Sequence, residues 1–280
     1  MAGPTIDQAF ITKFNRDVHL VYQQKKSKIR GTVRTDADVD GNKVRFQKIG
    51  TVTAQSKGRH GDIPPSNPDH SYVEATMNDR YTLDYIDKLD LTKLNIDLRG
   101  GYVETHARAF GRETDDQIIT AMTAGATLTQ GTYSGNLTRN FVLEACEQLD
   151  AGDVDDDGMR FGLITPRSWS HLMTVSEFVS GDYVGPDLPF TKIGLEMRTW
   201  NGVHWIKHTR LPGRGTSQAK NYLYHFASVG HGINDEVDIT WDWENKKKAW
   251  SGAGSMSMGA VVIDSAGLVE LRVDDTAALP

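Results

Sequence analysis

Cysteine is almost absent from this sequence, because the 280 residues contain only Cys146. A lone cysteine excludes a disulfide within the chain, so the fold must be stable without that cross-link. Cys146 lies in FVLEACEQL, where a small buried core residue is the simpler interpretation and a reactive thiol the alternative. A chain of this kind is typical of a reducing cytoplasm.

Long apolar runs are missing as well. No stretch approaches the roughly 18 consecutive apolar residues that a membrane-spanning helix requires. The first residues, MAGPTIDQAFITKF, lack the basic start and apolar core of a secretory signal. We therefore expect no membrane among the partners of this protein.

Signatures of common catalytic sites are also missing. No glycine-rich loop carries the Lys-Ser or Lys-Thr pair of a phosphate-binding loop, and GSMSMG at residues 254–259 lacks the glycine spacing of a nucleophile elbow. His204 and His208 are four residues apart, but they lie in a strand pattern with no third metal ligand nearby. The sequence predicts neither an enzyme nor a bound cofactor.

Two acidic turns, DADVDG at 36–41 and DVDDDG at 153–158, look like the first half of a calcium-binding loop. Such a loop needs a bidentate carboxylate at its twelfth position. That position holds Gln47 in the first turn and Ile164 in the second. We expect ordinary turns in which aspartates bind nearby backbone amides, and weak divalent binding at a contact between chains stays open.

Basic residues are present in excess near the start of the chain, although the net charge is −6. Seven of them precede residue 35 and face only Asp7 and Asp17 among the acidic residues there: Lys13, Arg16, Lys25, Lys26, Lys28, Arg30 and Arg34. A basic arm of this kind can contact nucleic acid or an acidic neighbour, and a solvated terminus is the alternative.

Residues 43–86 indicate two strands around a polar tip. KVRFQKIGTVTAQ and SYVEATMNDRYTLDYI have extended patterns, and the intervening SKGRHGDIPPSNPDH is rich in Gly, Pro, Ser and Asn. A hairpin this long and polar cannot pack against itself. We expect it to project from the body and to be completed by another chain.

A long helix is expected over residues 90–110, followed by a break at Gly111. Thr114 and Gln117 then form a capping box for a second helix that ends at Gly125.

Later segments predict further helices and strands. Asn136 is expected to cap the next helix, and Thr165-Pro166 begins another. Asn201-Gly202 predicts a tight hairpin, and NYLYHFASVGHGI predicts one strand. Helices and strands are interleaved without regular alternation, so the expected fold class is α+β.

In order and spacing, these elements resemble the major capsid proteins of tailed bacteriophages, whose fold was first described for coliphage Hong Kong 97. KVRFQKIGTVTAQ…SYVEATMNDRYTLDYI is similar to the extended loop of that family, and DLTKLNIDLRGGYVETHARAFGRETDDQIITAM to its spine helix and the helix after it. FGLITPRSWSHLM is similar to a strand and helix of the axial domain, and SGAGSMSMGAVVIDSAGLVELRVD to closing strands of the peripheral domain.

The resemblance implies a domain organisation and a set of contacts. It implies an N-terminal arm at 1–42, an extended loop at 43–86, a peripheral domain at 87–132 and 255–280, and an axial domain at 133–254. Contacts between subunits are implied on the arm and loop, at Lys25, Lys26, Arg45, Phe46, Lys48, Arg59, Tyr72 and Arg80.

The resemblance also implies a function. Copies of the chain, as hexamers and pentamers, would form an icosahedral shell around double-stranded phage DNA held without sequence specificity. Expected partners are a portal and, because the chain starts close to the arm, a separate scaffolding protein; a decoration protein is left open. The implied location is the virion, with assembly in the cytoplasm of the bacterial host.

One feature of some family members is not expected here. They crosslink a hairpin lysine to an asparagine of the peripheral domain, and no asparagine follows Asn245. Two alternatives remain: an encapsulin-like compartment shell, and a monomeric module that binds carbohydrate through its tryptophans or binds calcium.

Overall fold

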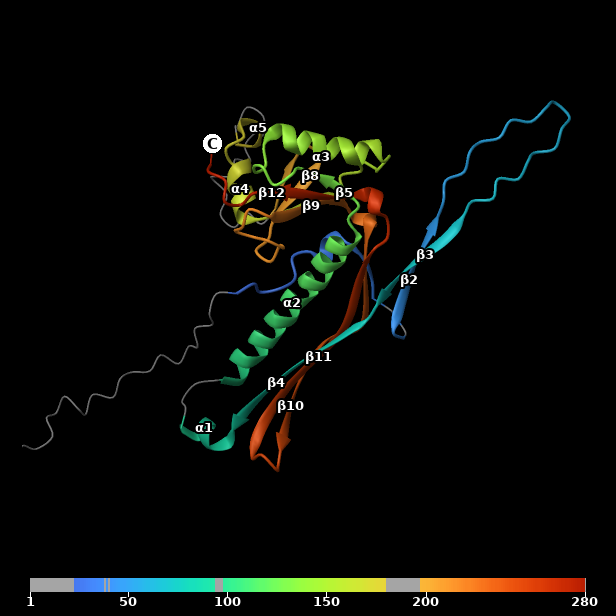
Figure 1. The fold of residues 1–280 in the computed structure, drawn as a ribbon. Coiled ribbons are helices and arrows are strands. Elements are labelled where there is room, and N and C mark those ends of the chain that lie inside the picture. Colours follow the sequence, from blue (N-terminus) through green and yellow to red (C-terminus); the bar gives the residue numbers. More distant parts are fainter. Residues whose placement is uncertain (1–22, 38, 40, 94–97, 180–196, 280) are drawn as a thin grey trace, which may run out of the picture.

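The protein is described by a computed structural model over residues 23–37, 39, 41–93, 98–179 and 197–279. Its helices and strands are interleaved, as expected for an α+β fold. Figure 1 shows three parts: a sheet packed with helices, a long sheet that lies beside helix α2, and a hairpin that projects from the body. No helix among the described residues is long and apolar enough to span a membrane.

A six-stranded sheet forms the core of the first part. Its strands, in spatial order, are β5 (Leu128–Gln130), β12 (Leu268–Val273), β9 (Ala219–His225), β6 (Arg160–Ile164), β8 (Val203–Lys207) and β7 (Met197–Trp200). Helices α3 (Arg139–Ala151), α4 (Pro166–Leu172) and α5 (Ser176–Val179) pack with one face, around the buried Trp205. Residues of the arm and of α2 pack with the other face, around Tyr222 and Tyr224.

Local sequence signals set several boundaries in this part. Thr165 caps α4, its hydroxyl accepting a hydrogen bond from the Ser168 amide, with proline at the first position as expected. Asn201 and Gly202 have φ angles of 53° and 71°, which confirms the tight hairpin between β7 and β8. The cap of α3 is Thr138, so the expectation for Asn136 was wrong. The Asn136 carboxamide instead donates to the Asp274 carbonyl.

A four-stranded sheet forms the second part, in the order β1 (Arg34–Asp36), β10 (Val229–Glu244), β11 (Ala249–Val262) and β4 (Asn78–Asp87). Helix α2 (Leu98–Gly125) contacts β10 and β11, and α1 (Lys88–Lys93) follows β4. Strand β11 places Gly254 under the Phe110 ring of α2, where a Cβ would lie 2.6 Å from that ring. Glycine in this strand therefore allows the helix to approach the sheet closely.

Strand β10 connects the two sheets and corrects the expected boundaries. The stretch NYLYHFASVGHGI is not one strand, because the short helix η3 (Phe226–Ser228) separates β9 from β10. Beyond it, β10 pairs with β11 and not with the six-stranded sheet. The range 133–254, expected to form the axial domain, therefore includes strands of the four-stranded sheet. Strand β12 falls in the range expected for the peripheral domain, but it lies in the six-stranded sheet.

The projecting hairpin is shorter than expected. Strands β2 (Lys43–Ile49) and β3 (His70–Thr76) pair with each other, whereas β4 leaves them and pairs with β11. The hairpin therefore covers residues 43–76 instead of 43–86. Its base packs on the body through Val44, Phe46 and Ala75, with Met77 and Ile263 beside them. Residues 50–69, here called the tip, extend beyond the paired strands (Figure 1).

Gly111 does not interrupt a helix, because α2 runs through it for 28 residues. A Cβ at Gly111 would lie 3.0 Å from the Lys26 Cα and the Ser27 nitrogen. The Thr114 hydroxyl bonds to the Phe110 carbonyl and caps nothing. Glycine is present at 111 because the arm crosses the helix there, which the sequence pattern alone does not reveal. The helix ends at Gly125, as expected.

Replacing Gly111 with alanine should loosen the arm while favouring the helix. Alanine improves helix propensity by about 1 kcal/mol, but its methyl group pushes on the backbone of Lys26 and Ser27. We expect cleavage of the arm by trypsin to become several-fold faster with little change in the free energy of unfolding. Gly135→Ala is the control, since no atom lies within 4 Å of a Cβ there. Unchanged cleavage in Gly111→Ala would contradict the role assigned to this crossing.

Candidate functional site

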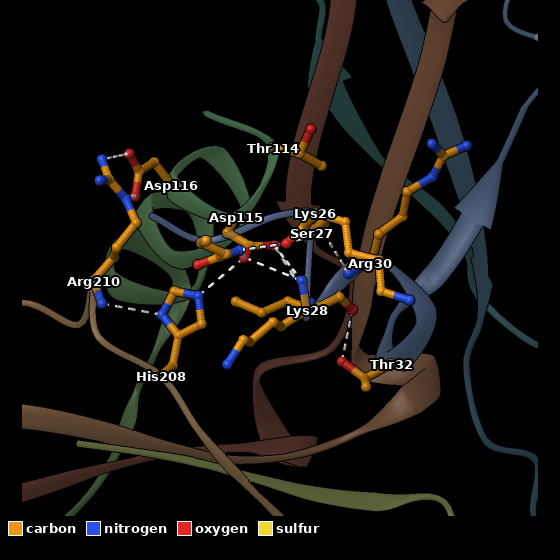
Figure 2. A network of polar contacts seen from close by, with 12 residues as sticks. Lys26, Ser27, Lys28, Arg30, Thr32, Thr114, Asp115, Asp116, His208 and Arg210 are labelled. Carbon is orange, nitrogen blue, oxygen red and sulfur yellow. Dashed lines mark hydrogen bonds and ion pairs between the residues drawn. The ribbon is translucent and has the colours of Figure 1, made fainter. Parts of the chain in front are cut away.

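The carboxylate of Asp115, on α2, is buried where the arm crosses the helix (Figure 2). It accepts hydrogen bonds from the Gln24 carboxamide, from the Ser27 hydroxyl at 2.5 Å, and from the amides of Lys28 and Ile29 at 3.1 and 3.3 Å. One side chain thus receives four donors from the arm. We call this arrangement the arm junction.

The arm junction also involves the six-stranded sheet, through His208 just after β8. His208 is fully buried, and its Nε2 lies 2.9 Å from Asp115 Oδ2. The Arg210 amide donates to Nδ1 at 3.2 Å, so the ring proton is on Nε2 and is donated to Asp115. Beside this pair, Arg210 forms a half-exposed ion pair with Asp116. The arm, the helix and the sheet are therefore joined at one buried carboxylate.

Burial and hydrogen bonding act in opposite directions on the pKa of Asp115. Burial is the larger single influence and by itself would raise this pKa. The hydrogen bonds from His208, Ser27, Gln24 and the Lys28 amide together outweigh it, and the pKa of Asp115 lies below its ordinary value. The carboxylate is therefore ionised at neutral pH and serves as a fixed acceptor for the arm.

A groove of about 1380 Å³ lies between the root of the arm and the six-stranded sheet. Its apolar lining comes from Met159, Phe161, Met197, Ile206 and Phe226. Its charged lining consists of Lys25, Lys26, Lys28 and Arg30, and none of the described Asp or Glu side chains lines it. We call this feature the arm groove.

The tip of the hairpin makes few contacts with the rest of the chain. Its hydrogen bonds among the described residues lie within the hairpin, at Gly50–Asp69, Gly58–Gly61 and Thr53–Ser66. Val52 and Ile63 are 59% and 72% exposed, and Lys57 and Arg59 are exposed beside them. The tip is thus an exposed surface with both apolar and basic groups.

Several of the expected contact residues stabilise the hairpin itself. Glu74 pairs with Lys43 and Arg45, both at 2.8 Å, and these partners lower its pKa. Arg45 also lies over the Tyr72 ring at 4.7 Å. Lys48 pairs with Asp264 at 2.8 Å and ties the hairpin to the body.

Two of the expected contact residues are engaged within the chain itself. Phe46 is 2% exposed and packs on Gly230 inside the hairpin base, so its own chain covers it. Arg80 belongs to β4 and pairs with Glu113 of α2 at 2.6 Å. Lys25, Lys26 and Arg59 are exposed, the first two at the arm groove and the third on the tip.

One face of the four-stranded sheet is not covered by α2. On β4 this face carries Tyr81, Leu83 and Tyr85, which are 75%, 53% and 41% exposed. Their β11 neighbours are small, with Ser255 opposite Tyr81 and Ala253 opposite Leu83.

The third strand gives this uncovered face an acidic border. Asp238 lies opposite Ser255 and Asp242 opposite Ser251 on β10. Both are exposed. A shallow hollow of about 260 Å³ runs between Tyr81 and Asp238. We call this face the sheet trough: aromatic on one border, small in the middle and acidic on the other.

The acidic turn at 153–158 bonds to groups of its own chain. Asp157 contacts His225 at 3.1 Å and accepts from the Met159 amide, and its pKa is lowered first by that amide and then by His225. The Arg160 guanidinium contacts Asp156 at 3.9 Å and, at 2.7 Å, Asp150 just before the turn. Within the described residues, no group of three His, Cys, Asp or Glu side chains is arranged to hold a metal ion. In the turn at 36–41, positions 38 and 40 lie outside the described residues.

Sequence reasoning missed the arm junction, although a signal for it was present. Asp115 precedes Ile118, Ile119 and Met122 by three, four and seven residues, so it lies on the apolar face of α2. A carboxylate on such a face must find several donors, because burial of an unpaired charge is costly. The donors themselves come from distant segments and could not be inferred from that pattern.

Comparisons with known proteins agree on one kind of relative. A family model described as phage capsid protein matches residues 6–275. The capsid of cyanophage P-SCSP1u is similar in structure, with a TM-score of 0.78, 14% identity, and coverage of 97% of this chain and 95% of that one. The capsid of Ralstonia phage GP4 has a TM-score of 0.76 at 12% identity, with 100% and 99% covered. No curated protein sequence matches the chain.

Proposed function

This chain belongs to the phage capsid protein family, and on that premise we propose that its copies, as hexamers and pentamers, enclose double-stranded phage DNA. The expected Hong Kong 97-type fold is confirmed by the similarity to capsid structures over nearly the whole chain. Its function as a major capsid protein is to build the icosahedral shell of the virion.

The observation that carries the proposal is the exposed tip at residues 50–69. Its apolar groups, Val52 and Ile63, are 59% and 72% exposed, and exposed apolar groups on a projecting hairpin favour association. In Figure 1 the hairpin points away from the part of the sheet formed by β4 and β10. A neighbouring copy is therefore the natural surface for the tip.

The sheet trough complements the tip in charge and in apolar character. Lys57 and Arg59 of the tip can meet Asp238 and Asp242 of a neighbour, while Val52 and Ile63 meet Tyr81 and Leu83. Each exposed ion pair contributes only about 0–1 kcal/mol. Repetition around a closed shell multiplies such contributions, because every copy both donates a tip and receives one.

The remaining parts of the proposal concern domains and partners. The arm, extended loop, peripheral domain and axial domain correspond to the residues before β2, the hairpin, the four-stranded sheet with α2, and the six-stranded sheet with its helices. A separate scaffolding protein and a portal assist assembly in the bacterial cytoplasm, and a decoration protein can bind outside. The net charge of −6 favours a wall that does not hold DNA tightly, since phosphate contacts require basic groups.

Charge reversal across the proposed contact tests it. The variant with Lys57→Glu and Arg59→Glu should lose shells, and so should the variant with Asp238→Lys and Asp242→Lys, because each places like charges together. Combining all four changes should restore shells, as seen by sedimentation and electron microscopy of protein expressed in bacteria. Glu147→Lys on α3 is the control for a reversed surface charge.

Two outcomes would count against the proposal. Shells that persist in both double variants would exclude the sheet trough as the receptor for the tip. A fourfold variant that stays unassembled, although folded, would show that the two surfaces do not meet. DNA inside the native particles distinguishes a phage shell from an encapsulin-like compartment.

A further inference from the structure

We infer that the arm groove is a docking site for an acidic amphipathic helix of a partner protein. The inference goes beyond the shell contact proposed above, and it concerns a different surface. Three observations carry it: an apolar floor, a rim of one charge sign, and a buried anchor that holds the rim in place.

The floor of the arm groove is apolar and accessible. Met159 and Met197 are 48% and 46% exposed, values that are high for large apolar side chains. Phe161 and Phe226 line the groove beside them. Methionine is flexible and polarisable, and binding surfaces that receive helices use it for this reason. The volume of the groove is comparable to that of about three turns of helix.

Among the described residues that line the arm groove, the charged side chains are all basic. Lys25, Lys26, Lys28 and Arg30 line it, on a chain whose net charge is −6. Arg30 pairs with Glu236, whereas the three lysines have no ion pair among the described residues. Basic groups gathered on one side of an apolar floor favour a partner with carboxylates beside an apolar stripe.

The arm junction holds this rim in position. The Lys28 amide donates to Asp115, and so do the Ser27 hydroxyl and the Gln24 carboxamide on either side of Lys25 and Lys26 (Figure 2). Because the backbone between Gln24 and Ile29 is fixed by these bonds, little ordering of the rim is needed when a partner binds. The same carboxylate thus anchors the arm and shapes the docking site.

Nucleic acid fits the arm groove less well than a peptide. Phosphate contacts need the lysines alone and gain nothing from an apolar floor with two exposed methionines. An amphipathic helix uses both features, since its apolar stripe covers the floor while its carboxylates face the rim. Assembly partners that bind and later leave can use contacts of this mixed kind.

Fluorescence anisotropy with a defined probe tests the inference on the full-length protein. The probe is a labelled peptide of about 18 residues, with leucine at helical spacing on one face and glutamate elsewhere. We expect it to bind saturably, and we expect the same peptide with lysine in place of glutamate to bind at least about tenfold more weakly.

Paired variants locate the binding site. Lys25→Glu with Lys26→Glu should weaken binding of the glutamate peptide by about tenfold, and Met159→Asp with Met197→Asp by a similar factor. Lys246→Glu, at an exposed lysine in the turn between β10 and β11, should leave binding within about twofold. Circular dichroism shows whether each variant is folded. If the variant with Met159→Asp and Met197→Asp is unfolded, the variant with Met159→Gln and Met197→Gln provides the same test.

Three results would overturn the inference: no saturable binding of the glutamate peptide, equal binding of the lysine peptide, or binding that both paired variants leave unchanged. Duplex DNA that displaces the peptide, in a manner sensitive to the lysines but not to the methionines, would assign the groove to nucleic acid instead. Because the readout is peptide binding and not particle formation, failure here leaves the shell contact untouched.

Discussion

Replacing residues 51–68 with Asn-Gly should abolish shell formation while leaving the chain folded. The new turn joins Gly50 to Asp69, whose backbones already bond to each other at 2.8 Å, and Asn-Gly is the sequence that such a two-residue turn prefers. Among the described residues, the deleted segment makes hydrogen bonds only within itself, so the free energy of unfolding should change by less than about 0.5 kcal/mol.

The loss of shells follows from the loss of the apolar and basic groups that the tip presents to a neighbouring copy. Sedimentation and electron microscopy should find unassembled protein, and urea denaturation should find a midpoint close to that of the full chain. The conservative control keeps the length of the tip and replaces Val52 and Ile63 with serine, which should weaken assembly less. Shells of normal size from the shortened chain would refute the assignment of the tip to intersubunit contact.

Removing the carboxylate of Asp115 should cause the largest loss of stability from a single substitution. In Asp115→Ala, the Ser27 hydroxyl, the amides of Lys28 and Ile29 and the His208 ring lose their common acceptor. Breaking a buried charged network by removal of one partner costs about 3–5 kcal/mol. Urea denaturation measures this cost, and faster trypsin cleavage after Lys25 and Lys26 locates it in the arm.

The neighbouring carboxylate is a matched control. Asp116 pairs with Arg210 at a site where both side chains are more than a quarter exposed, so Asp116→Ala should cost no more than about 1 kcal/mol. Equal losses of stability in Asp115→Ala and Asp116→Ala would show that the arm junction stabilises the fold no more than a partly exposed ion pair does.

The pH dependence of stability supplies a second measurement on Asp115. Its pKa is lowered in the folded protein, so the unfolded chain binds a proton at a higher pH than the folded chain does. The stabilisation is therefore complete above the unfolded pKa of about 4 and is lost as pH falls through the lower folded value. Asp115→Ala should show a shallower loss of stability on acidification than the native chain.

Features set by neighbouring residues were predictable from the sequence, and features set by distant ones were not. Thr165-Pro166 and Asn201-Gly202 impose local geometry, and the structure has the expected helix start and turn. A glycine within a helical pattern suggests a helix break, yet Gly111 instead leaves room for the arm to cross α2. The path of β4 away from the hairpin depends on pairing with β11, a strand far along the chain.

The contact residues show the same division. Exposure of Lys25, Lys26 and Arg59 follows from their polar surroundings, whereas burial of Phe46 depends on the space above Gly230. The alternation in residues 43–49 indicates that Val44 and Phe46 share a face, but it does not show that Gly230 leaves room for the Phe46 ring. The arm junction likewise needed the fold, since its donors and acceptor are about 90 residues apart in the chain.

The base of the hairpin, where β3 leads into β4, determines where the shell can flex. Only Met77, a buried residue, separates β3 from β4, so the direction of the hairpin is tied to that of β4, an edge strand of the four-stranded sheet. Such a joint is stiff, because tilting the hairpin would pull β4 away from β11 along its whole ladder. In the proposed shell of hexamers and pentamers, differences in curvature would then be absorbed beyond Ile49 and His70, where ladder pairing ends. The tip is rich in Gly and Pro, and this composition makes it more flexible than the base of the hairpin.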